Sequence, residues 1–280
     1  NLRIVDHRNL HDRESALVSL VSGGNKAIVY VTSLQQSIEV VRLLRHRLPD
    51  LAGRIAFYNA GLPRDVRGRV ESAFRAGDLA CIVSTSAFGE GVNLPDVRDV
   101  VLYGLPYGAV ELNQMSGRAG RDGLPARVHM LFSARDMRVN ERVISQAAPA
   151  RDDLVALYRS IRTLADASGR LTSSDEELLA MTARVAPALH VSEQEVQSGL
   201  SVFAELGFLT VSGWGEKRCI VVETSPARME LARSARYLEG ENLREEFREF
   251  ADWVFSCPCE ELLAHVDRPI TPGFGSTVTE

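Results

Sequence analysis

The segment QMSGRAGRDG, residues 114–123, combines residue types that could bind a nucleotide. We read it as part of one helix that starts near Ala109. Gln114, Arg118 and Arg121 then stand at positions i, i+4 and i+7, so their side chains share one face. A guanidinium group stays charged and can bind two phosphate oxygens at once. In phosphoryl transfer such a group stabilises the charge that develops in the transition state.

Two glycines in the same segment, Gly117 and Gly120, indicate that a second surface lies close to it. In a helix interior each glycine costs about 1 kcal/mol relative to alanine, so two in four residues need a reason such as close backbone approach. The alternative for this segment alone is a glycine-weakened surface helix with two solvated arginines.

Strands that alternate with helices are predicted around this motif. Short apolar runs rich in Val, Ile and aromatic residues are typical of buried strands, and they occupy residues 27–31, 54–58, 80–84, 99–103 and 128–132. Helical patterning fills residues 34–48 and 64–75. This order predicts a parallel sheet covered on both faces, with ligands bound beyond the carboxyl ends of the strands. Thr32, Ser84–Ser86 and the loop 104–108 fall at such ends.

The succession of these segments resembles the second motor lobe of superfamily 2 helicases, most closely the RecQ group. The resemblance runs from about Ala27 to Met137, and AIVYVTS (27–33), RIAFYNAGL (54–62), STSAFGEGVNLP (84–95) and QMSGRAGRDG carry it. It implies a RecA-like fold that works with ATP, Mg²⁺ and DNA. In that group AIVYVTS would be motif IV, STSAFGEGVNLP motif V and QMSGRAGRDG motif VI.

The resemblance also implies roles for individual residues. Arg121 resembles the arginine finger, Arg118 a second phosphate-binding or coupling arginine, and Gln114 a polar partner in the same cleft. The residues expected at the nucleotide are Gly89, Gly91, Asn93, Arg118 and Arg121, and those expected along a DNA strand are Thr32, Ser33, Asn59, Ser84 and Thr85. Two positions depart from the group: Asn59 stands where a histidine is usual, and Glu90 where a methionine is common.

A phosphate-binding loop of the type G-x-x-x-x-G-K-[ST] is absent from the sequence, and so is an Asp-Glu box after a strand. An arginine finger without such a loop cannot complete ATP hydrolysis. The first residue is Asn1 rather than Met. We therefore expect a fragment whose first motor lobe, with the Walker A and B motifs, lies upstream. The chain alone is expected neither to bind ATP tightly nor to hydrolyse it.

Four parts are expected along the chain, namely a second RecA-like lobe (1–147), a connecting helix (148–169), an α+β winged-helix domain (170–225) and a helical C-terminal segment with a tail (226–280). The winged helix is predicted from helices at 174–185 and 192–206 and from strands at 208–211 and 219–222. The pattern EVQSGLSVFAELGFLTV within it resembles winged-helix domains.

The turn between the two predicted strands carries Trp214, Lys217 and Arg218, which are candidates for contact with unpaired nucleic acid, because an aromatic ring beside cations suits stacked bases. In the alternative, Trp214 packs on its own hairpin and the domain binds protein.

Charge and cysteine content narrow the class of protein. The net charge of −5 over 280 residues divides into +4 for residues 1–147 and −9 for residues 148–280, so only the first part suits phosphates. The four cysteines are too scattered for a disulfide scaffold, and Cys257-Pro258-Cys259 lacks a second ligand pair, so no metal site is expected. No signal peptide or long apolar stretch is present, and a cytoplasmic location without membrane contact is expected.

These observations favour the C-terminal part of an ATP-dependent RecQ-like DNA helicase of repair or recombination. Its partners would be single-stranded or forked DNA and the N-terminal RecA-like lobe of the same polypeptide. The alternative is a catalytically inactive nucleic-acid-binding or regulatory module. The C-terminal segment loosely resembles proteins that join a RecQ-like motor to a RecJ-type single-strand DNA exonuclease, so a nuclease domain could be a further partner. An RNA helicase also fits the motifs shared across the superfamily.

Overall fold

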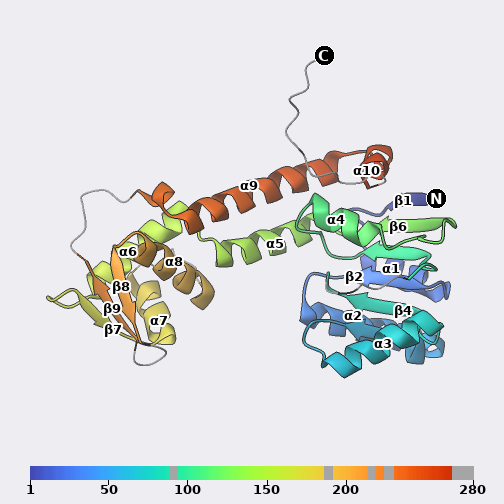
Figure 1. Ribbon diagram of the computed structural model, residues 1–280, viewed down its shortest axis with the longest axis horizontal. Helices are drawn as coiled ribbons and strands as arrows, with labels where there is room; N and C mark the ends of the chain where they lie inside the picture. Colours follow the sequence, from blue (N-terminus) through green and yellow to red (C-terminus); the bar gives the residue numbers. More distant parts are fainter. Residues whose placement is uncertain (87, 89–93, 186–191, 214–217, 224–229, 267–280) are drawn as a thin grey trace, which may run out of the picture. The chain divides into compact units, whose positions relative to one another are not determined.

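The computed structural model of this chain describes residues 1–86, 88, 94–185, 192–213, 218–223 and 230–266. The chain forms two compact units, and the element labels below follow Figure 1. Unit 1 comprises Asn1–Met137 and Phe250–Glu280, and unit 2 comprises Arg138–Glu249.

Unit 1 is built on a parallel sheet that has six strands within the described residues, in the order β1-β6-β5-β2-β4-β3 (Figure 1). The strands are β1 (Leu2–Asp6), β2 (Ala27–Tyr30), β3 (Ile55–Tyr58), β4 (Cys81–Ser84), β5 (Asp99–Leu102) and β6 (Ala126–Met130). Five of them coincide with the predicted apolar runs, and β1 was not predicted. The predicted RecA-like α/β architecture is confirmed.

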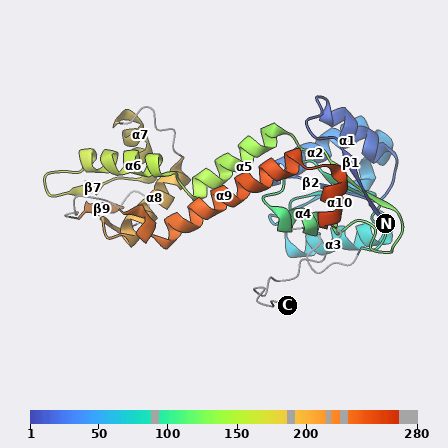
Figure 2. The ribbon, with the colours of Figure 1, turned by 90° about the horizontal axis from the view of Figure 1, so that it is seen from above.

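Helices cover both faces of this sheet. They are α1 (Arg13–Ser22), α2 (Leu34–Arg47), α3 (Arg64–Ala76), α4 (Ala109–Ser116) and α10 (Cys259–Val266), and a 3-10 turn (Pro49–Arg54) links α2 to β3. Figure 2 shows α1 and α2 on one side of the sheet and α3 and α4 on the other. Val29 and Val31 pack with Leu17 of α1 and Leu44 of α2. Because side chains alternate along a strand, Tyr30 faces the side of α3 and α4.

Strand β2 marks the place where the chain changes direction across the sheet. The chain builds β3 and β4 on one flank of β2 and then β5 and β6 on the other. In register, Tyr30 of β2 pairs with Ser84 of β4 and with Leu102 of β5, so the three strands end at the same level. Such a switch point opens a crevice beyond the carboxyl ends of the strands. Thr32, Thr85, Ser86 and residues 104–107, which were expected at strand ends, line one hollow at this point.

Asp99, the first residue of β5, anchors a buried polar network in this sheet. Its carboxylate accepts hydrogen bonds from Arg127 Nε at 2.7 Å and lies 2.9 Å from His129 Nε2. Asp99 and His129 are both almost completely buried. Burial raises the pKa of Asp99, but the hydrogen bonds from His129 and Arg127 outweigh burial and lower it to about 2.

Unit 2 contains a three-stranded antiparallel sheet in the order β7-β9-β8. Its elements are α6 (Arg151–Leu164), β7 (Arg170–Thr172), α7 (Asp175–Val185), α8 (Glu193–Glu205), β8 (Leu209–Ser212), β9 (Cys219–Val222) and a 3-10 turn (Leu231–Arg233). Helices α5 (Ala134–Ala147) and α9 (Ala235–Ser256) each run from one unit into the other. The helices and the hairpin follow the order predicted for a winged helix, and the predicted capping box joins Ser192 and Glu195.

The core of unit 2 includes the helix that was expected to be a connector. Leu157 and Ile161 of α6 are buried in one cluster with Phe203 of α8 and Ile220 of β9. Helix α6 is therefore an integral part of this unit, whereas the sequence suggested a separate segment at 148–169. The segment expected at 226–280 is divided, because α10 packs against β1 and α4 in unit 1.

The described residues contain no candidate for a membrane-spanning helix or a metal cluster. None of the helices has the length and hydropathy required to cross a membrane. In the same part of the chain, no cluster of three or more His, Cys, Asp and Glu side chains could hold a metal ion.

Candidate functional site

The two arginines of the motif lie in a loop rather than on a helix. Helix α4 ends at Ser116, and residues 117–123, here called the arginine loop, form turns. The prediction of one helix through Gln114, Arg118 and Arg121 is therefore wrong. The backbone leaves the helix at the C-cap residue Gly117, and Gly120, whose φ of 62° is left-handed, excludes a right-handed helix through to Arg121.

The arginine loop is braced on several sides. The backbone N–H of Gly120 donates to Val97 O at 2.9 Å, and the side chain of Asn1 donates to Gly120 O at 2.6 Å. Arg98 donates to the carboxylate of Asp122. A Cβ atom added to Gly120 would lie 2.9 Å from both Leu124 O and the Cβ of residue 126. The expected close backbone approach at this glycine is thus confirmed.

A cleft at the carboxyl ends of β2 and β4 brings motif residues together. A hollow of about 100 Å³ is lined by Tyr30, Ser86, Phe88, Glu111, Gln114, Met115 and Arg118. An adjoining hollow of about 80 Å³ shares Tyr30 and Glu111 and extends to Thr32, Thr85 and Gly104. Both are small beside the roughly 300–1,000 Å³ of a complete ligand pocket, so neither is a complete pocket by itself.

Tyr30 lies at the centre of this cleft. Its ring is 2% exposed, and its hydroxyl donates to Phe88 O at 3.3 Å. Burial raises the pKa of Tyr30 to about 12, although the charges of Arg118 and Arg121 and a hydrogen bond with Arg118 act in the opposite direction. The phenol and Arg118 line the same hollow.

Arg121 is exposed, and its Nε donates to Gly117 O at 3.0 Å. Desolvation, followed by the charge of Arg118, lowers the pKa of Arg121 from its ordinary value of 12.5. The two guanidinium groups thus repel each other. An anion with several oxygens placed between them would relieve this repulsion.

Among the described residues, Glu111 supplies the carboxylate that lines the cleft. Glu111 Oε2 accepts a hydrogen bond from the backbone N–H of Tyr107 at 2.7 Å. Burial, and then the charge of Glu111, raise the pKa of the Tyr107 phenol. Because Glu111 is held by the backbone, it stabilises the loop that follows β5.

The residues predicted along a DNA strand have different environments. Thr32 is partly exposed, and its N–H and hydroxyl both donate to Gln36 Oε1. Ser33 is exposed and caps α2 by accepting from the N–H of Gln36 at 3.1 Å. Thr85 is partly exposed and lines the cleft. Thr32, Ser33 and Thr85 are therefore accessible in part to a ligand.

The other two predicted contacts are buried. Ser84 is 0% exposed and donates to Thr85 O, and Asn59 is 4% exposed. The amide of Asn59 donates to Ser37 Oγ at 3.1 Å and accepts from the N–H of Gly61 at 3.1 Å. In this structure Asn59 stabilises the turn after β3 and is covered from solvent.

Five predicted site residues lie outside the described residues, namely Gly89, Gly91, Asn93, Trp214 and Lys217. Arg218 is described at the start of β9, is 4% exposed, and donates from Nη2 to Ser174 O at 3.4 Å. A side chain buried in this way does not present its charge to a DNA strand, so the structure gives no support to the predicted contact at Arg218.

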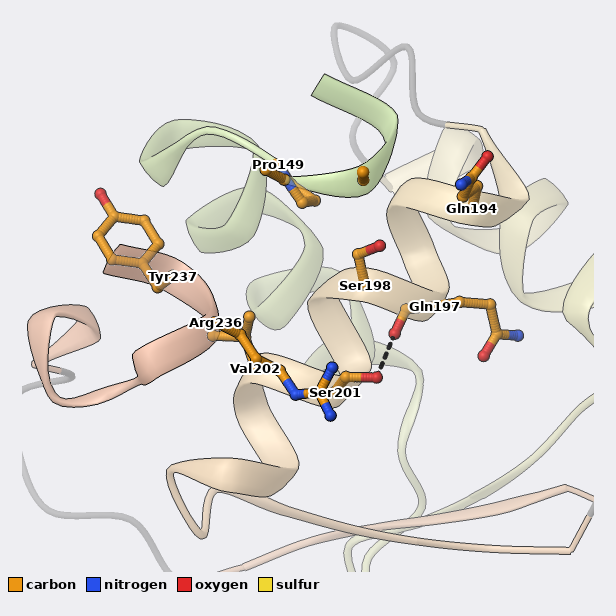
Figure 3. Close-up of a pocket in the computed structure, with 10 residues that line it drawn as sticks. Pro149, Gln194, Gln197, Ser198, Ser201, Val202, Arg236 and Tyr237 are labelled. Atoms are coloured by element: carbon orange, nitrogen blue, oxygen red, sulfur yellow. Dashed lines mark hydrogen bonds between the residues drawn. The ribbon is translucent and has the colours of Figure 1, made fainter. Parts of the chain in front are cut away.

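A larger hollow of about 190 Å³ lies in unit 2, away from the motif residues (Figure 3). Gln194, Gln197 and Ser201 of α8 line it together with Pro149 and Tyr237. Figure 3 shows the Ser201 hydroxyl bonded to Gln197 O. Its lining offers amides, hydroxyls and one arginine, Arg236, but no pair of acid and base or nucleophile and base. Size alone therefore does not make it the better candidate.

Sequence reasoning did not select Tyr30, Phe88 or Glu111 as site residues. A signal for Tyr30 was available, because it is the last residue of a buried strand and alternates with Val29 and Val31. Glu111 could have been identified because it stands three residues before Gln114 on the same helix, and residues at this spacing are neighbours on the helix surface. Phe88 reaches the cleft through its backbone carbonyl, which no sequence pattern reveals.

Comparisons with known proteins agree with this geometry. A protein-family profile described as helicase conserved C-terminal domain matches residues 12–123. The human ATP-dependent DNA helicase Q4 is 34% identical over 145 residues, covering 46% of this chain and 12% of that protein. ATP-dependent helicase wrn-1 of Caenorhabditis elegans is 35% identical, covering 41% of this chain and 10% of that protein. The ATP-dependent DNA helicase RecQ of Bacillus subtilis is 32% identical, covering 48% and 25% respectively.

The chain spans about a tenth to a quarter of the length of these relatives. The family profile covers the strands β2 to β5, the arginine loop and the strand-end cleft. Residues 12–123 of this chain therefore match the helicase conserved C-terminal domain, and the chain is similar over this region to ATP-dependent DNA helicases of the RecQ-like group.

Proposed function

We propose that this chain is the second motor lobe, with its accessory unit, of an ATP-dependent RecQ-like DNA helicase that acts in DNA repair or recombination. The observation that carries the proposal is the gathering of Gln114, Arg118 and the Tyr30 phenol in one cleft at the switch point of the sheet, with Arg121 beside them. Such a cationic wall suits the triphosphate of a nucleotide.

The residues present fit one side of an ATP site. Two guanidinium groups and an amide supply donors for phosphate oxygens, while the only carboxylate that lines the described part of the cleft, Glu111, is bound to backbone. ATP with Mg²⁺ would be held mainly by the N-terminal RecA-like lobe of the same polypeptide. When bound, ATP supplies the phosphoryl transfer that drives movement. Arg121 would neutralise charge on the transferred group, and Arg118 would orient the phosphate end.

The same strand ends offer a track for single-stranded DNA. Thr32, Ser33 and Thr85 carry hydroxyl groups that can donate to phosphate oxygens without reading base sequence. Thr85 and Arg118 line adjoining hollows of the cleft. A change in the position of Arg118 would therefore alter the position of Thr85 on the DNA track. Closing and opening of the cleft would thus be linked to movement along the strand.

The proposal is tested with the full polypeptide that contains this chain, by ATPase and fork-unwinding assays with and without single-stranded DNA. Arg121→Ala is expected to lower the DNA-stimulated kcat about 10³-fold or more, the range found when an arginine finger is lost. The matched control is Arg3→Ala, an exposed arginine on β1 of the same unit. DNA-stimulated turnover that persists in Arg121→Ala would contradict the proposal.

If the chain instead belongs to a catalytically inactive regulatory module, the folded wild-type protein should bind DNA without any DNA-stimulated ATP hydrolysis. Each relative named above bears the name of an ATP-dependent helicase, which favours the motor. Parallel assays on single-stranded RNA would identify an RNA helicase. A cytoplasmic location, a fused nuclease domain and wing contacts by Trp214 and Lys217 stay predictions.

A further inference from the structure

We propose that Arg13 is a positioning residue of the motor, which links the loop that lines the cleft to the first turn of helix α5. The inference rests on the proposed function and deepens it, because the chain passes from unit 1 into unit 2 within α5. Arg13 lines neither hollow of the cleft, so it contacts neither ATP nor DNA in this scheme.

The place of Arg13 in its helix requires a charged partner. Arg13 is the first residue of α1, where the positive end of the helix dipole disfavours a cation. Its Nη1 donates to Asp136 Oδ2 at 2.5 Å, and the side chains of Arg13 and Asp136 are 20% and 8% exposed. Asp136 lies in the first turn of α5, where the dipole favours a carboxylate. The ion pair therefore joins the starts of two helices.

The ring of Tyr103 is the second contact of Arg13. Arg13 Cζ lies 4.2 Å from the ring centroid, which places the guanidinium over the face of the ring. Tyr103 is 5% exposed and directly follows β5. The next four residues, 104–107, line the cleft. Arg13 thus lies between the start of the cleft loop and the start of α5.

The cleft loop is packed closely against the strand that precedes the DNA track. The N–H groups of Tyr103 and Gly104 both donate to Tyr30 O, at 2.9 Å and 3.0 Å. A Cβ atom added to Gly104 would lie 2.6 Å from Thr32 Cγ2 and 3.0 Å from Thr32 N. Because close-packed groups transmit displacement, a shift of Thr32 or of residues 104–107 also shifts Tyr103.

The start of α5 is held together around Asp136. Its Oδ2 also accepts from the N–H of Ser133 at 2.8 Å and from the Ser133 hydroxyl at 3.0 Å, while Asn9 Oδ1 accepts from the N–H of Ala134 at 3.0 Å. A shift of Arg13 therefore moves this turn as one body. The same bonds keep Asp136 satisfied when Arg13 is replaced, so a substitution there breaks the link without leaving a bare buried carboxylate.

The first test compares Arg13→Met with Arg127→Met in the full polypeptide. Arg127 is a matched control because it is also paired with a buried aspartate, with 2.7 Å between Arg127 Nε and Asp99 Oδ1. Asp99 stands at the opposite end of β5 from Tyr103. The readouts are the DNA-stimulated kcat for ATP hydrolysis and the number of base pairs unwound per ATP hydrolysed.

Arg13→Met is expected to lower the number of base pairs unwound per ATP about fivefold or more and to keep the kcat within about twofold, because the link transmits movement and does not touch the nucleotide. Arg13→Lys keeps a charge for Asp136 but lacks the planar group that stacks on Tyr103, so it should keep thermal stability and still lower this ratio. Arg127→Met is expected to keep the wild-type ratio. A wild-type ratio in either Arg13 variant, or an equal fall in Arg127→Met, would overturn the inference.

A second measurement separates this inference from the proposed function, because it needs no motor activity. In the 280-residue chain, amide hydrogen exchange is followed at Ser133 and at Asp136, whose N–H donates to Ser133 O at 2.9 Å. Tyr103→Leu removes the ring and keeps the ion pair, and it is expected to speed this exchange about fivefold. In an Arg13→Met background the same substitution is expected to have no effect.

The two tests fail in different ways. Equal effects of Tyr103→Leu with and without Arg13 would show that the ring does not act on α5 through the guanidinium, and would overturn the inference whatever the activity. Absence of ATP hydrolysis in the wild-type full polypeptide would count against the proposed function alone.

Discussion

Gly120 and Gly123 of the arginine loop both have a left-handed backbone but differ in their surroundings. Comparing the same substitution at the two glycines therefore separates the effect of close packing, next to Arg121, from the effect of the backbone conformation. Gly120 has φ 62° and Gly123 has φ 80°. A Cβ atom at Gly120 would lie 2.9 Å from both Leu124 O and the Cβ of residue 126, and 2.5 Å from Asn1 Nδ2. A Cβ atom at Gly123 would meet nothing within 4 Å.

The expected magnitudes follow from these contacts. Gly123→Ala adds only the cost of a left-handed alanine, about 1 kcal/mol. Gly120→Ala adds the same cost and an overlap that costs roughly 1–3 kcal/mol more. The overlap cannot be relieved by side-chain movement alone, since Leu124 O is backbone and residue 126 begins β6. We therefore expect Gly120→Ala to destabilise unit 1 by about 2–4 kcal/mol.

The assay is amide hydrogen exchange at β6, because the chain has two units and a single unfolding transition cannot be assumed. Gly120→Ala should also lower DNA-stimulated ATPase in the full polypeptide, since the loop that moves carries Arg118 and Arg121. Equal losses of stability in Gly120→Ala and Gly123→Ala would refute the reasoning, because they would show that the contacts around Gly120 carry no energy.

Three further predictions concern the rest of unit 1. The pKa of Asp99 is lowered to about 2 from the ordinary 3.8. Ionised Asp99 therefore stabilises the folded state by about 2 kcal/mol above about pH 4, and this stabilisation is lost as the pH falls towards 2. Asp99→Asn should remove that part of the acid transition, and an unaltered transition in urea titrations would contradict it. Burial raises the pKa of Cys81 to about 12, so this thiol should resist alkylation at pH 8 until the chain unfolds, which mass spectrometry of labelled peptides can check. Arg8, in the turn after β1, donates from Nη1 to two carbonyls at the end of α9, at 2.6 Å and 2.9 Å. Arg8→Ala should therefore speed hydrogen exchange across α10, while Arg3→Ala on β1 should not; equal exchange in the two variants would refute this anchor.

The central part of the fold was predictable because buried parallel strands leave continuous apolar runs in the sequence. Ile28 and Val29 of β2 are both fully covered, so the run has no gaps. β1 escaped prediction because it is an edge strand in which only Ile4 is buried. Its pairing with β6 depends on contacts between residues more than 120 positions apart, and no local pattern records them.

The candidate site was predicted by residue type but only partly by geometry. Gln114 and Arg118 line one cleft as expected. The prediction of a helix through Arg121 was wrong. The local sequence pattern suits a helix, but hydrogen bonds of Gly120 with Val97 and Asn1 stabilise a turn instead. Sequence reasoning can find the charged groups of a site, but the backbone that aims them depends on partners distant along the chain.

The order of strands in the sheet has a consequence for how the chain folds. β1 is the first strand of this chain, yet it pairs with β6, the last strand of the sheet, and α10 then packs on β1 from beyond unit 2. Contacts of such long sequence separation require the closure of large loops, which slows folding. During synthesis the segment 1–6 must wait for residues 126–130, and its covering helix emerges only after all of unit 2. Segment 1–6 is therefore the strand of this sheet that is exposed to mispairing with other chains while the protein is being made.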